Sequence, residues 1–399
     1  MKVLFVCNKS PFPPKEGGAM VMYAALMGLL EAGHTVKVLT FSSNKFPTKD
    51  IPDIISDDVE TVNINLTITP WMAFKNLFSR KSLHIVRFIN KEMEQKLIRQ
   101  LTSEHFDIVQ LESLYMTPYI DTIRKHSTAA IILRAHNIEY RIWKRIAGNS
   151  KFFLKRLYIN LLAERLKRYE ISVLNKIDGV ATLSQVDLDF YRRMGGSVPM
   201  KSIPFSINTG EFPYDDFGIP EFPSFYHIGS MDWMPNQEGI QWFLKTAWPA
   251  IHKKNTNAVF YLAGRNMPDW LLKDGISGVT VIGEVEDSQQ FMRSKCILTV
   301  PLLSGSGIRI KIIEGMACVR PILTTTIGAE GIDYTDGDNI MIADTPEEFI
   351  DKAQKLIDNY ELCKEMGESA HALISEKYDT KKIIVELLNF YNFVSKNRE

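Results

Sequence analysis

The chain has 399 residues, of which 45% are hydrophobic and 24% are charged. This composition excludes a disordered tail and a collagen-like fibre, and the length indicates two or three domains at about 150 residues each. The four cysteines have no metal-ligand spacing, which argues against a zinc site or a disulfide framework and fits a reduced compartment.

The formal net charge of zero hides an uneven distribution. Residues 1–210 carry 29 Lys and Arg against 19 Asp and Glu, whereas residues 211–399 carry 18 against 28. The basic half favours an anionic partner such as a membrane surface, and no nucleic-acid-binding motif accompanies the charge. Because no run of 18 apolar residues and no signal peptide is present, we expect a cytoplasmic protein, peripheral on the inner face of the plasma membrane.

In the first half of the chain, short apolar runs alternate with helical segments. Strands are predicted at 3–7, 35–40, 108–111, 129–133 and 180–183, and helices at 19–32 and 185–194, the last capped by Ser184. The segment 140–176 predicts one long helix crowded with Lys, Arg and aromatic residues. That pattern is typical of a surface that binds anionic lipid, or of a solvated helix that covers the sheet.

A proline-rich stretch at 205–225 reads as a linker, after which the alternation restarts. Strands are predicted at 225–228, 258–262, 279–282, 296–300, 321–324 and 340–342, and helices at 236–248 and 308–317. The fold class is therefore α/β, with two doubly wound domains at 1–208 and 209–380. Ligands in such sheets bind beyond the carboxyl ends of the strands, so we expect the pocket in a cleft between the domains.

The stretch 304–317 carries the strongest chemical signal. Gly305, Ser306 and Gly307 turn the chain into a helix whose free N–H groups favour an anion. Arg309 and Lys311 in the first turn are unfavourable to the helix unless an anion such as a diphosphate lies there. The alternative is two solvent-exposed charges on an ordinary helix.

Smaller signals lie at the other predicted strand ends. Glu314 can accept hydrogen bonds from two ribose hydroxyls, or is a surface carboxylate. Gly17 and Gly18 form a weaker anion-binding turn without the GxGxxG fingerprint. Three successive strands of the second half end at Gly229-Ser230, at Gly264-Arg265, and at Gly283 with Val285 beyond it, while Asn236 is placed to cap a helix.

His136 follows a predicted strand of the first half. It can donate a hydrogen bond to a sugar hydroxyl or to a developing charge, or it is a satisfied structural histidine. We assign Glu112, Asn137 and Glu139, which lie at or near the same strand ends, to an acceptor.

Taken together, these motifs resemble those of the retaining, sugar-nucleotide-dependent glycosyltransferases of family 4, which have the GT-B fold. The resemblance rests on Gly17-Gly18, the His136 segment, the crossover at 203–212 and the stretch 304–331. It implies two Rossmann-like domains that face each other across a cleft, with 381–399 packing back on the N-terminal domain, a bacterial glycan-biosynthesis subgroup, and catalytic roles for His136 and Glu314.

The sequence departs from the family pattern at three places. The signature helix of the family carries two glutamates eight positions apart; Glu314 matches the second, which is assigned to the donor ribose, but Ser306 replaces the first. Met231 and Asp232 lie where an Arg and Lys pair is usual, and we infer that Arg309, Lys311 and Arg265 supply that charge. Val319 replaces a small residue, which predicts a packing difference.

The resemblance implies a metal-independent hexosyltransferase without a cofactor, acting on a lipid-linked or growing bacterial polysaccharide such as capsule or lipopolysaccharide. Its donor would be a nucleotide diphosphate sugar. The alternatives are a non-catalytic GT-B scaffold that partners another transferase, which Ser306 favours, and a nucleotide-sugar epimerase. The predicted donor-binding residues are Gly17, Gly18, Gly229, Ser230, Arg265, Gly283, Val285, Gly305, Ser306, Gly307, Arg309, Lys311 and Glu314.

Overall fold

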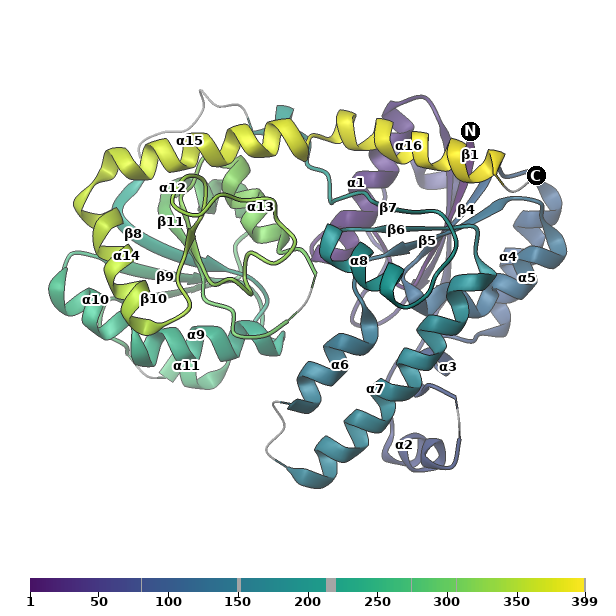
Figure 1. Cartoon of the computed structure of the whole chain (residues 1–399), viewed down its shortest axis with the longest axis horizontal. Helices are drawn as coiled ribbons and strands as arrows, with labels where there is room; N and C mark the ends of the chain where they lie inside the picture. Colours follow the sequence, from purple (N-terminus) through teal and green to yellow (C-terminus); the bar gives the residue numbers. More distant parts are fainter. Residues whose placement is uncertain (80, 149–151, 213–219, 274, 306, 398–399) are drawn as a thin grey trace. The chain divides into compact units, whose positions relative to one another are not determined.

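The structure is a computed structural model that describes residues 1–79, 81–148, 152–212, 220–273, 275–305 and 307–397. The chain divides into two compact units (Figure 1). Unit 1 comprises Met1–Ser206 and Thr380–Glu399, and unit 2 comprises Ile207–Asp379. Each unit is built on one parallel sheet, as the alternation of apolar runs and helical segments predicts.

Seven parallel strands form the sheet of unit 1, in the order β3-β2-β1-β4-β5-β6-β7. The strands are β1 (Lys2–Cys7), β2 (Thr35–Ser42), β3 (Val59–Asn63), β4 (Ile108–Glu112), β5 (Ala130–Ala135), β6 (Gly179–Thr182) and β7 (Met200–Ser202). The edge strands β3 and β7 were not predicted, because both are short and only partly buried and therefore lack a continuous apolar run.

Helices cover both faces of this sheet. They are α1 (Gly17–Glu31), α2 (Pro70–Leu77), α3 (Leu83–Val86), α4 (Lys91–Ser103), α5 (Ile120–His126), α6 (Glu139–Gly148), α7 (Phe153–Val173), α8 (Gln185–Arg193) and α16 (Thr380–Lys396). Successive residues of β1 point to opposite faces: Val3 and Phe5 pack with α1 and α16, whereas Leu4 and Val6 pack with α4 and α5. Ser184 caps α8 as predicted.

The predicted single helix over 140–176 is wrong. The segment forms two helices, α6 and α7, which lie side by side (Figure 1), and the junction at 149–151 lies outside the described residues. Leu162 and Leu166 of α7 are buried, and Arg165 donates hydrogen bonds to the carbonyl oxygens of Asn76 and Leu77 at the end of α2. The three helices α2, α6 and α7 therefore form one extension of unit 1.

The C-terminal helix α16 completes unit 1. A Cβ atom added to Gly28 of α1 would lie 2.5 Å from Cγ1 of Ile384, so only glycine lets the two helices approach this closely. Gly179 at the start of β6 plays the same part against Val394. Through these contacts, residues of α16 lie in the same hydrophobic core as residues of β1.

Six parallel strands form the sheet of unit 2, in the order β10-β9-β8-β11-β12-β13. The strands are β8 (Glu221–Ile228), β9 (Val259–Ala263), β10 (Val279–Gly283), β11 (Lys295–Val300), β12 (Ile322–Thr324) and β13 (Met341–Ile342). The helices are α9 (Met234–Thr246), α10 (Trp248–Lys254), α11 (Asp269–Lys273), α12 (Ser288–Ser294), α13 (Ile310–Ala317), α14 (Pro346–Asp358) and α15 (Tyr360–Lys377).

The stretch 205–225 contains more regular structure than a linker. Strand β8 begins at Glu221, and the residues 213–219 lie outside the described part of the chain. Pro223 is tolerated in this strand because the register against β11 shifts beside it, between the pairs Lys295↔Glu221 and Ile297↔Phe225. Proline was thus a misleading signal here.

The turn after α13 is strained at Val319. This residue has φ of +57°, in the left-handed region that glycine favours, and its amide donates to the Met316 carbonyl oxygen. The sequence predicted a difference in packing at this position. In the structure the unusual feature at this position is the backbone, because the β-branched Val319 follows the helix in the left-handed conformation that glycine favours.

Candidate donor and transfer sites

Glycines gather where the strands of unit 2 end. The amide of Gly229 donates to the Ala263 carbonyl oxygen at 3.0 Å, and that of Gly264 donates to the Gly283 carbonyl oxygen at 2.7 Å. A Cβ atom on Gly264, whose φ is +134°, would lie 1.9 Å from the Gly229 carbonyl oxygen. The loops after β8, β9 and β10 are therefore packed backbone against backbone at the carboxyl edge of the sheet.

Lys311 reaches this edge from the first turn of α13. Its Nζ atom donates to Nε2 of His227 and to Oδ1 of Asn236, both at 3.0 Å. A Cβ atom added to Gly229 would lie 2.5 Å from the Lys311 Nζ atom, so glycine makes room for the ammonium beneath this loop. Within the described part of the chain, Lys311 forms no salt bridge.

The hydrogen-bond network fixes the charge state of His227. Its Nδ1 atom lies 2.9 Å from the Thr299 carbonyl oxygen, which can only accept, so Nδ1 carries the proton and Nε2 accepts from Lys311. Burial and the Lys311 charge hold the pKa of His227 well below its ordinary value. The ring is neutral and serves as an acceptor for the ammonium.

Asn236 does not cap a helix, contrary to the prediction. Helix α9 begins at Met234 without a side-chain cap, and Asn236 is buried inside its first turn. Its amide nitrogen donates to the Ser230 carbonyl oxygen at 2.8 Å while its oxygen accepts from Lys311. Asn236 therefore ties the position of Lys311 to the loop after β8.

Arg309 precedes α13 and is not in its first turn, where the sequence placed it. It is the N-cap residue, buried, with its guanidinium donating to the carbonyl oxygen of Gly307 and lying 5.5 Å from the ring centroid of Trp233. Gly305 and Gly307 both have positive φ, and a Cβ atom on Gly305 would lie 2.9 Å from Arg309 Nη2. The Arg309 guanidinium therefore packs against Gly305 and Gly307.

Burial lowers the pKa of Lys311 to about 7, with the neighbouring Arg309 acting in the same direction. Burial also raises the pKa of Glu314, one turn further along α13, to about 7, against the opposing effect of Lys311. Among the described residues, the Glu314 carboxylate accepts no hydrogen bond. A half-buried carboxylate and a half-buried ammonium thus lie on one helix, each titrating near neutral pH.

The other predicted donor residues of unit 2 lie on loops at the same edge of the sheet. Ser230, Arg265 and Val285 are half-buried; the Ser230 hydroxyl donates to Asp232, and the Arg265 carbonyl oxygen accepts from the Met231 amide at 2.8 Å. Ser306 lies outside the described residues.

In unit 1, His136 directly follows β5 and is paired with Glu112. The two side chains meet through His136 Nε2 and Glu112 Oε2 at 2.6 Å. Since an ionised carboxylate only accepts, Nε2 donates this hydrogen bond, and in a neutral ring Nδ1 is then the acceptor. Nδ1 lies 3.5 Å from the position of a Cβ atom on Gly18, so the ring faces the first turn of α1.

Glu112 does not offer a surface to an acceptor, contrary to the assignment from sequence. It is fully buried, and its second oxygen accepts from Nε2 of Gln110 at 2.6 Å. Gln110 in turn accepts a hydrogen bond from the hydroxyl of Tyr391 on α16. Ser113, the next residue, has φ of +79°, and strain of this kind in a non-glycine residue clusters at functional sites.

The remaining residues predicted in unit 1 divide between its surface and its core. Gly17 and Gly18 begin α1, which has no side-chain cap and no acidic residue in its first turn. Asn137 is half-buried beside His136. Glu139 is buried and accepts from the Tyr115 hydroxyl at 2.6 Å, and burial raises its pKa to about 6.

Behind this group lies a second buried carboxylate, Glu170 of α7. It accepts from the Tyr191 hydroxyl at 2.7 Å and from the amides of Glu139 and Tyr140 at the start of α6, and burial raises its pKa to about 8. The carboxylate therefore occupies the N-terminus of α6 and fixes that helix to α7.

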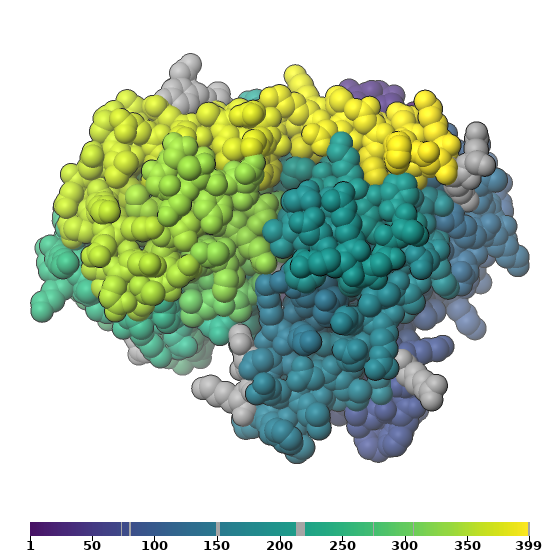
Figure 2. Space-filling view, in the orientation of Figure 1, coloured from purple at the N-terminus to yellow at the C-terminus, as the bar shows by residue number. Residues whose placement is uncertain are grey.

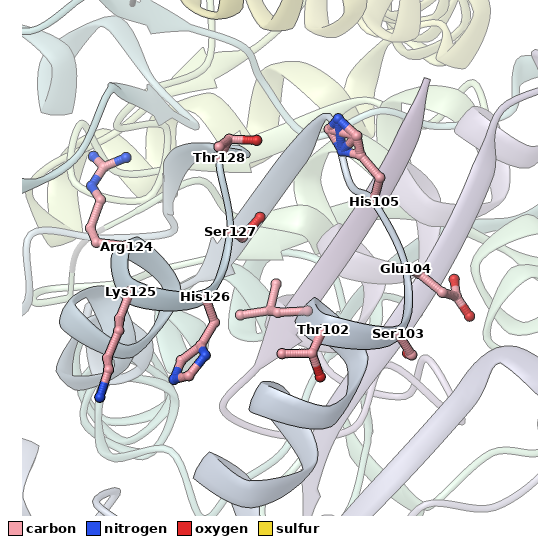
Figure 3. Close-up of a pocket in the computed structure, with 10 residues that line it drawn as sticks. Thr102, Ser103, Glu104, His105, Arg124, Lys125, His126, Ser127 and Thr128 are labelled. Carbon is pink, nitrogen blue, oxygen red and sulfur yellow. The ribbon is translucent and has the colours of Figure 1, made fainter.

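A hollow lined by His105, Arg124, Lys125 and His126 lies elsewhere on unit 1 (Figure 3). Its residues belong to the ends of α4 and α5 and to the connections that lead into β4 and β5. In a parallel sheet these connections lie at the amino edge, opposite the edge that carries His136. The hollow is therefore separate from the candidate site.

Three important residues were missed from sequence. His227, Gln110 and Tyr391 sit inside segments that otherwise consist mainly of apolar residues, in β8, β4 and α16. A polar residue within a buried strand was the available signal, because burying such a group is unfavourable unless it has a partner.

Two doubly wound parallel sheets, each with its polar groups at the carboxyl ends of the strands, define a GT-B type of α/β protein. Residues 223–359, within unit 2, match the family model described as "Glycosyl transferases group 1". The chain is 24% identical over 406 residues to an uncharacterized 44.6 kDa protein in the cps region of Klebsiella pneumoniae, covering 96% of this chain and 97% of that protein. It is 26% identical over 292 residues to an uncharacterized glycosyltransferase of Methanocaldococcus jannaschii, covering 71% of each.

Solved structures with the same fold cover nearly the whole chain. Sucrose-phosphate synthase from Thermosynechococcus elongatus has a TM-score of 0.72 at 14% identity, covering 99% of both chains. HepE from Anabaena, in complex with UDP and glucose, has a TM-score of 0.66 at 14% identity, covering 98% of both chains. The solved structures confirm the predicted GT-B fold. The match of residues 223–359 to the family model and the sequence similarity to the Methanocaldococcus jannaschii protein support a glycosyltransferase.

Two features are absent from the described residues. No helix there is both long and apolar enough to cross a bilayer. No group of three His, Cys, Asp or Glu side chains in the same part of the chain is arranged to hold a metal ion.

Proposed function

We propose that the protein is a retaining glycosyltransferase of family 4 that moves a hexose from a nucleotide diphosphate sugar to a lipid-linked or growing polysaccharide. The observation that carries this proposal is the Lys311 ammonium, held by His227 and Asn236 beneath Gly229 without a salt bridge to any described residue. A charge held in this way suits an anionic ligand, because a diphosphate supplies the missing counter-charge.

Unit 2 binds the donor in this proposal. Lys311 and the amides of the glycine turns hold the diphosphate, with Arg309 packed against Gly305 and Gly307, and Glu314 accepts hydrogen bonds from the ribose hydroxyls. The solved structure of HepE contains UDP, which supports a uridine nucleotide as the first donor to test.

Unit 1 supplies His136 and the acceptor side, with Gly17 and Gly18 at its open helix start. The lone pair on Nδ1 of His136 accepts a hydrogen bond from a sugar hydroxyl, which fixes the sugar during transfer. Asn137 beside it contacts the acceptor.

The reaction balances without a cofactor. The bond between the anomeric carbon and the diphosphate oxygen breaks as the sugar becomes oxocarbenium-like, and the acceptor oxygen bonds to the same face of that carbon. The acceptor proton passes to the departing phosphate oxygen. Lys311 stabilises the charge that develops on the leaving diphosphate, so no metal ion is required in this scheme.

The acceptor is proposed to be lipid-linked and the enzyme cytoplasmic, peripheral on the inner face of the plasma membrane. Unit 1 carries 33 Lys and Arg against 21 Asp and Glu, a balance that favours an anionic surface. The relative in the cps region of Klebsiella pneumoniae supports capsule biosynthesis as the setting.

The test is a transfer assay with UDP-, GDP-, ADP- and dTDP-sugars, run with and without vesicles of bacterial lipid extract. We expect one donor to be consumed only when vesicles are present, with retention of anomeric configuration in the product. Lys311→Met should abolish consumption, and Lys253→Met, an exposed lysine on α10, should not.

Other outcomes of this assay identify the alternatives. Consumption of a donor without vesicles, giving an isomeric nucleotide sugar, would indicate an epimerase. No turnover of any donor by the folded protein would indicate a non-catalytic scaffold.

A further inference from the structure

The extension formed by α2, α6 and α7 carries an unusual apolar surface. On α2, Trp71 is 61% exposed, Phe74 is exposed and Phe78, just beyond the helix, is 81% exposed. At the start of α7, Phe153 is 75% exposed and Leu157 is also exposed. We call these residues, with the neighbouring exposed Met72, Leu77, Phe152 and Leu154, the apolar tip.

The apolar tip is built from the protein's own contacts and does not result from loose chain ends. Arg165 of α7 donates hydrogen bonds to Asn76 and Leu77, and Asn76 donates to the Lys81 carbonyl oxygen, so α2 is fixed to α7. Trp71 stacks on Phe74 at 5.8 Å between ring centroids. These side chains therefore point outward while their backbone is held, and Figure 2 shows α2, α6 and α7 at the lower end of unit 1.

The charges around the apolar tip have one sign. Residues 61–91 and 140–163, which include α2, all of α6 except its first residue, the buried Glu139, and the first half of α7, contain 11 Lys and Arg and no Asp or Glu. The Lys75 ammonium lies 4.9 Å from the centroid of the Trp71 ring, and Lys155 and Arg156 are exposed beside Phe153. Aromatic side chains mixed with basic ones suit the headgroup region of an anionic bilayer, where rings insert and cations meet phosphates.

We propose that the apolar tip inserts into the headgroup region of an anionic lipid bilayer and docks unit 1 on it. This inference rests on the proposed function only for its purpose, namely access to a lipid-linked acceptor. The aromatic residues of the apolar tip lie on two separate elements, α2 and the start of α7, and do not form one flat surface. A lipid surface can deform around both of them. The unbroken positive charge selects anionic lipid over a neutral one.

The experiment measures sedimentation of the full chain with phosphatidylcholine vesicles that contain 30% phosphatidylglycerol or none. We expect binding to the anionic vesicles at least tenfold tighter than to the neutral ones. The double variant W71D/F78D and the variant Phe153→Asp should each weaken binding at least tenfold. Phe393→Asp, which changes an aromatic residue on α16 that is 55% exposed, is the control and should bind as the wild type.

Insertion has a second readout in quenching of Trp71 fluorescence by brominated lipid, measured against a Trp71→Phe variant. Equal binding by wild type and W71D/F78D, or no binding to anionic vesicles, would overturn the proposal, and the second result would point to a protein partner for the apolar tip. Vesicle binding needs no donor, so failure of sugar transfer with binding intact would count against the proposed function alone.

A different observation carries a second inference. Gln110, Glu112 and Tyr391 are fully buried polar side chains in a core face that is otherwise mainly apolar, and they form a chain that ends at His136. Buried polar groups weaken a core unless they are satisfied, and the buried Arg134, which interacts electrostatically with Glu112 and Tyr391, belongs to the same cluster. The geometry points to Tyr391 on α16 as a positioning residue that acts through Gln110 and Glu112 on His136.

The chain of hydrogen bonds has a direction. The Tyr391 hydroxyl donates to Gln110, whose amide nitrogen donates to Glu112, and Glu112 accepts the Nε2 proton of His136. With both oxygens of Glu112 engaged, its carboxylate cannot turn, and the His136 ring keeps Nδ1 as its acceptor. The end of the polypeptide thereby fixes the tautomer of a residue more than 200 positions earlier.

The test compares Tyr391→Phe with Tyr119→Phe, which removes another buried hydroxyl of unit 1, one that donates to the Phe88 carbonyl oxygen. We expect Tyr391→Phe to shift the 15N signals of the His136 ring and to lower kcat about three- to tenfold at unchanged donor KM. Glu112→Gln should do both more strongly, and Glu112→Asp should restore part of the loss. Tyr119→Phe should change neither.

Unchanged ring signals in Tyr391→Phe would overturn the relay. The ring signals do not require turnover, so a protein that shows the expected 15N shifts but transfers no sugar would refute the proposed function and leave the relay standing.

Discussion

Each unit holds a polar side chain at the carboxyl edge of its parallel sheet, but the two units hold it with different partners. In unit 1, the Nε2–H group of His136 donates a hydrogen bond to the carboxylate of Glu112, which holds the ring. In unit 2, Lys311 is held by the neutral groups His227 and Asn236, and its charge is not balanced by a salt bridge to a described residue. The first arrangement orients a ring, and the second keeps a charge available for a ligand.

The two units also differ in formal net charge. Unit 1 has 12 more basic than acidic residues, and unit 2 has 12 fewer. The acidic unit therefore contains the cation that we assign to diphosphate, and the basic unit contains the buried carboxylates Glu112, Glu139 and Glu170. Net charge describes how the surface of each unit interacts, whereas the site chemistry depends on a few buried groups.

The largest effect is expected from Lys311→Met. Removing a charge-assisted hydrogen bond to a diphosphate costs about 1.5–3 kcal/mol, so the Kd for UDP should rise about 10- to 150-fold. Isothermal titration calorimetry measures it, with Lys253→Met as the control. An unchanged Kd would remove the distinction between the two units, because Lys311 would then be as internally satisfied as His136.

A substitution at Gly28 tests the close packing of α1 against α16 in unit 1. A valine there would place its Cβ atom 2.5 Å from Ile384 Cγ1 and should cost about 1–3 kcal/mol by overpacking. Hydrogen exchange should show faster opening of α1 and α16 while peptides of unit 2 keep their protection. Gly148→Ala, where an added Cβ meets no atom within 4 Å, is the control. Equal loss of protection in both units would contradict their separation.

The affinity for UDP should depend on pH, with a maximum near pH 7. The pKa of Lys311 is lowered to about 7, so above this pH the neutral amine must take up a proton to bind the anion, and the affinity should fall up to about tenfold per pH unit. The pKa of Glu314 is raised to about 7, so below this pH the carboxyl is protonated and loses one acceptor for the ribose hydroxyls. Calorimetry at pH 6, 7, 8 and 9 measures both limbs.

Two variants separate the two groups. Lys311→Arg should abolish the alkaline fall, because a guanidinium stays protonated, and Glu314→Gln should abolish the acid fall. An alkaline fall of the same size in Lys311→Arg would show that another group titrates.

The smallest effect is expected at Val319. Because a side chain in the left-handed region costs about 1–2 kcal/mol, Val319→Gly should stabilise unit 2 by roughly 1 kcal/mol after loss of some side-chain contact. Urea denaturation measures it. Val319→Ala keeps the unfavourable φ and should give no gain, and a loss of stability in Val319→Gly would mean that the side-chain contacts outweigh the strain.

The sequence by itself determined most of the architecture. Val3–Cys7 is a run of five apolar residues, and Cys296–Val300 is apolar except for Thr299. Short runs of this kind between turn residues are typical of strands that a parallel sheet buries on both faces. The sequence also singled out Lys311, Glu314 and His136 as site residues, which stays a prediction, since charged or titratable residues directly after a buried strand or at a helix start have few structural explanations. The edge strands and the break between α6 and α7 escaped, because partial burial leaves a weak pattern.

Only the tertiary structure decided which side chains meet. Glu112, predicted to contact an acceptor, is the hydrogen-bond partner of His136, 24 positions away, because strand order brings the two together. Asn236, predicted to cap a helix, accepts a hydrogen bond from Lys311, 75 positions away, because of how the loops pack. Tyr391 reaches Gln110 across 281 positions, a contact that no local pattern encodes. Local propensity depends on neighbours along the chain, whereas hydrogen bonding and desolvation depend on neighbours in space.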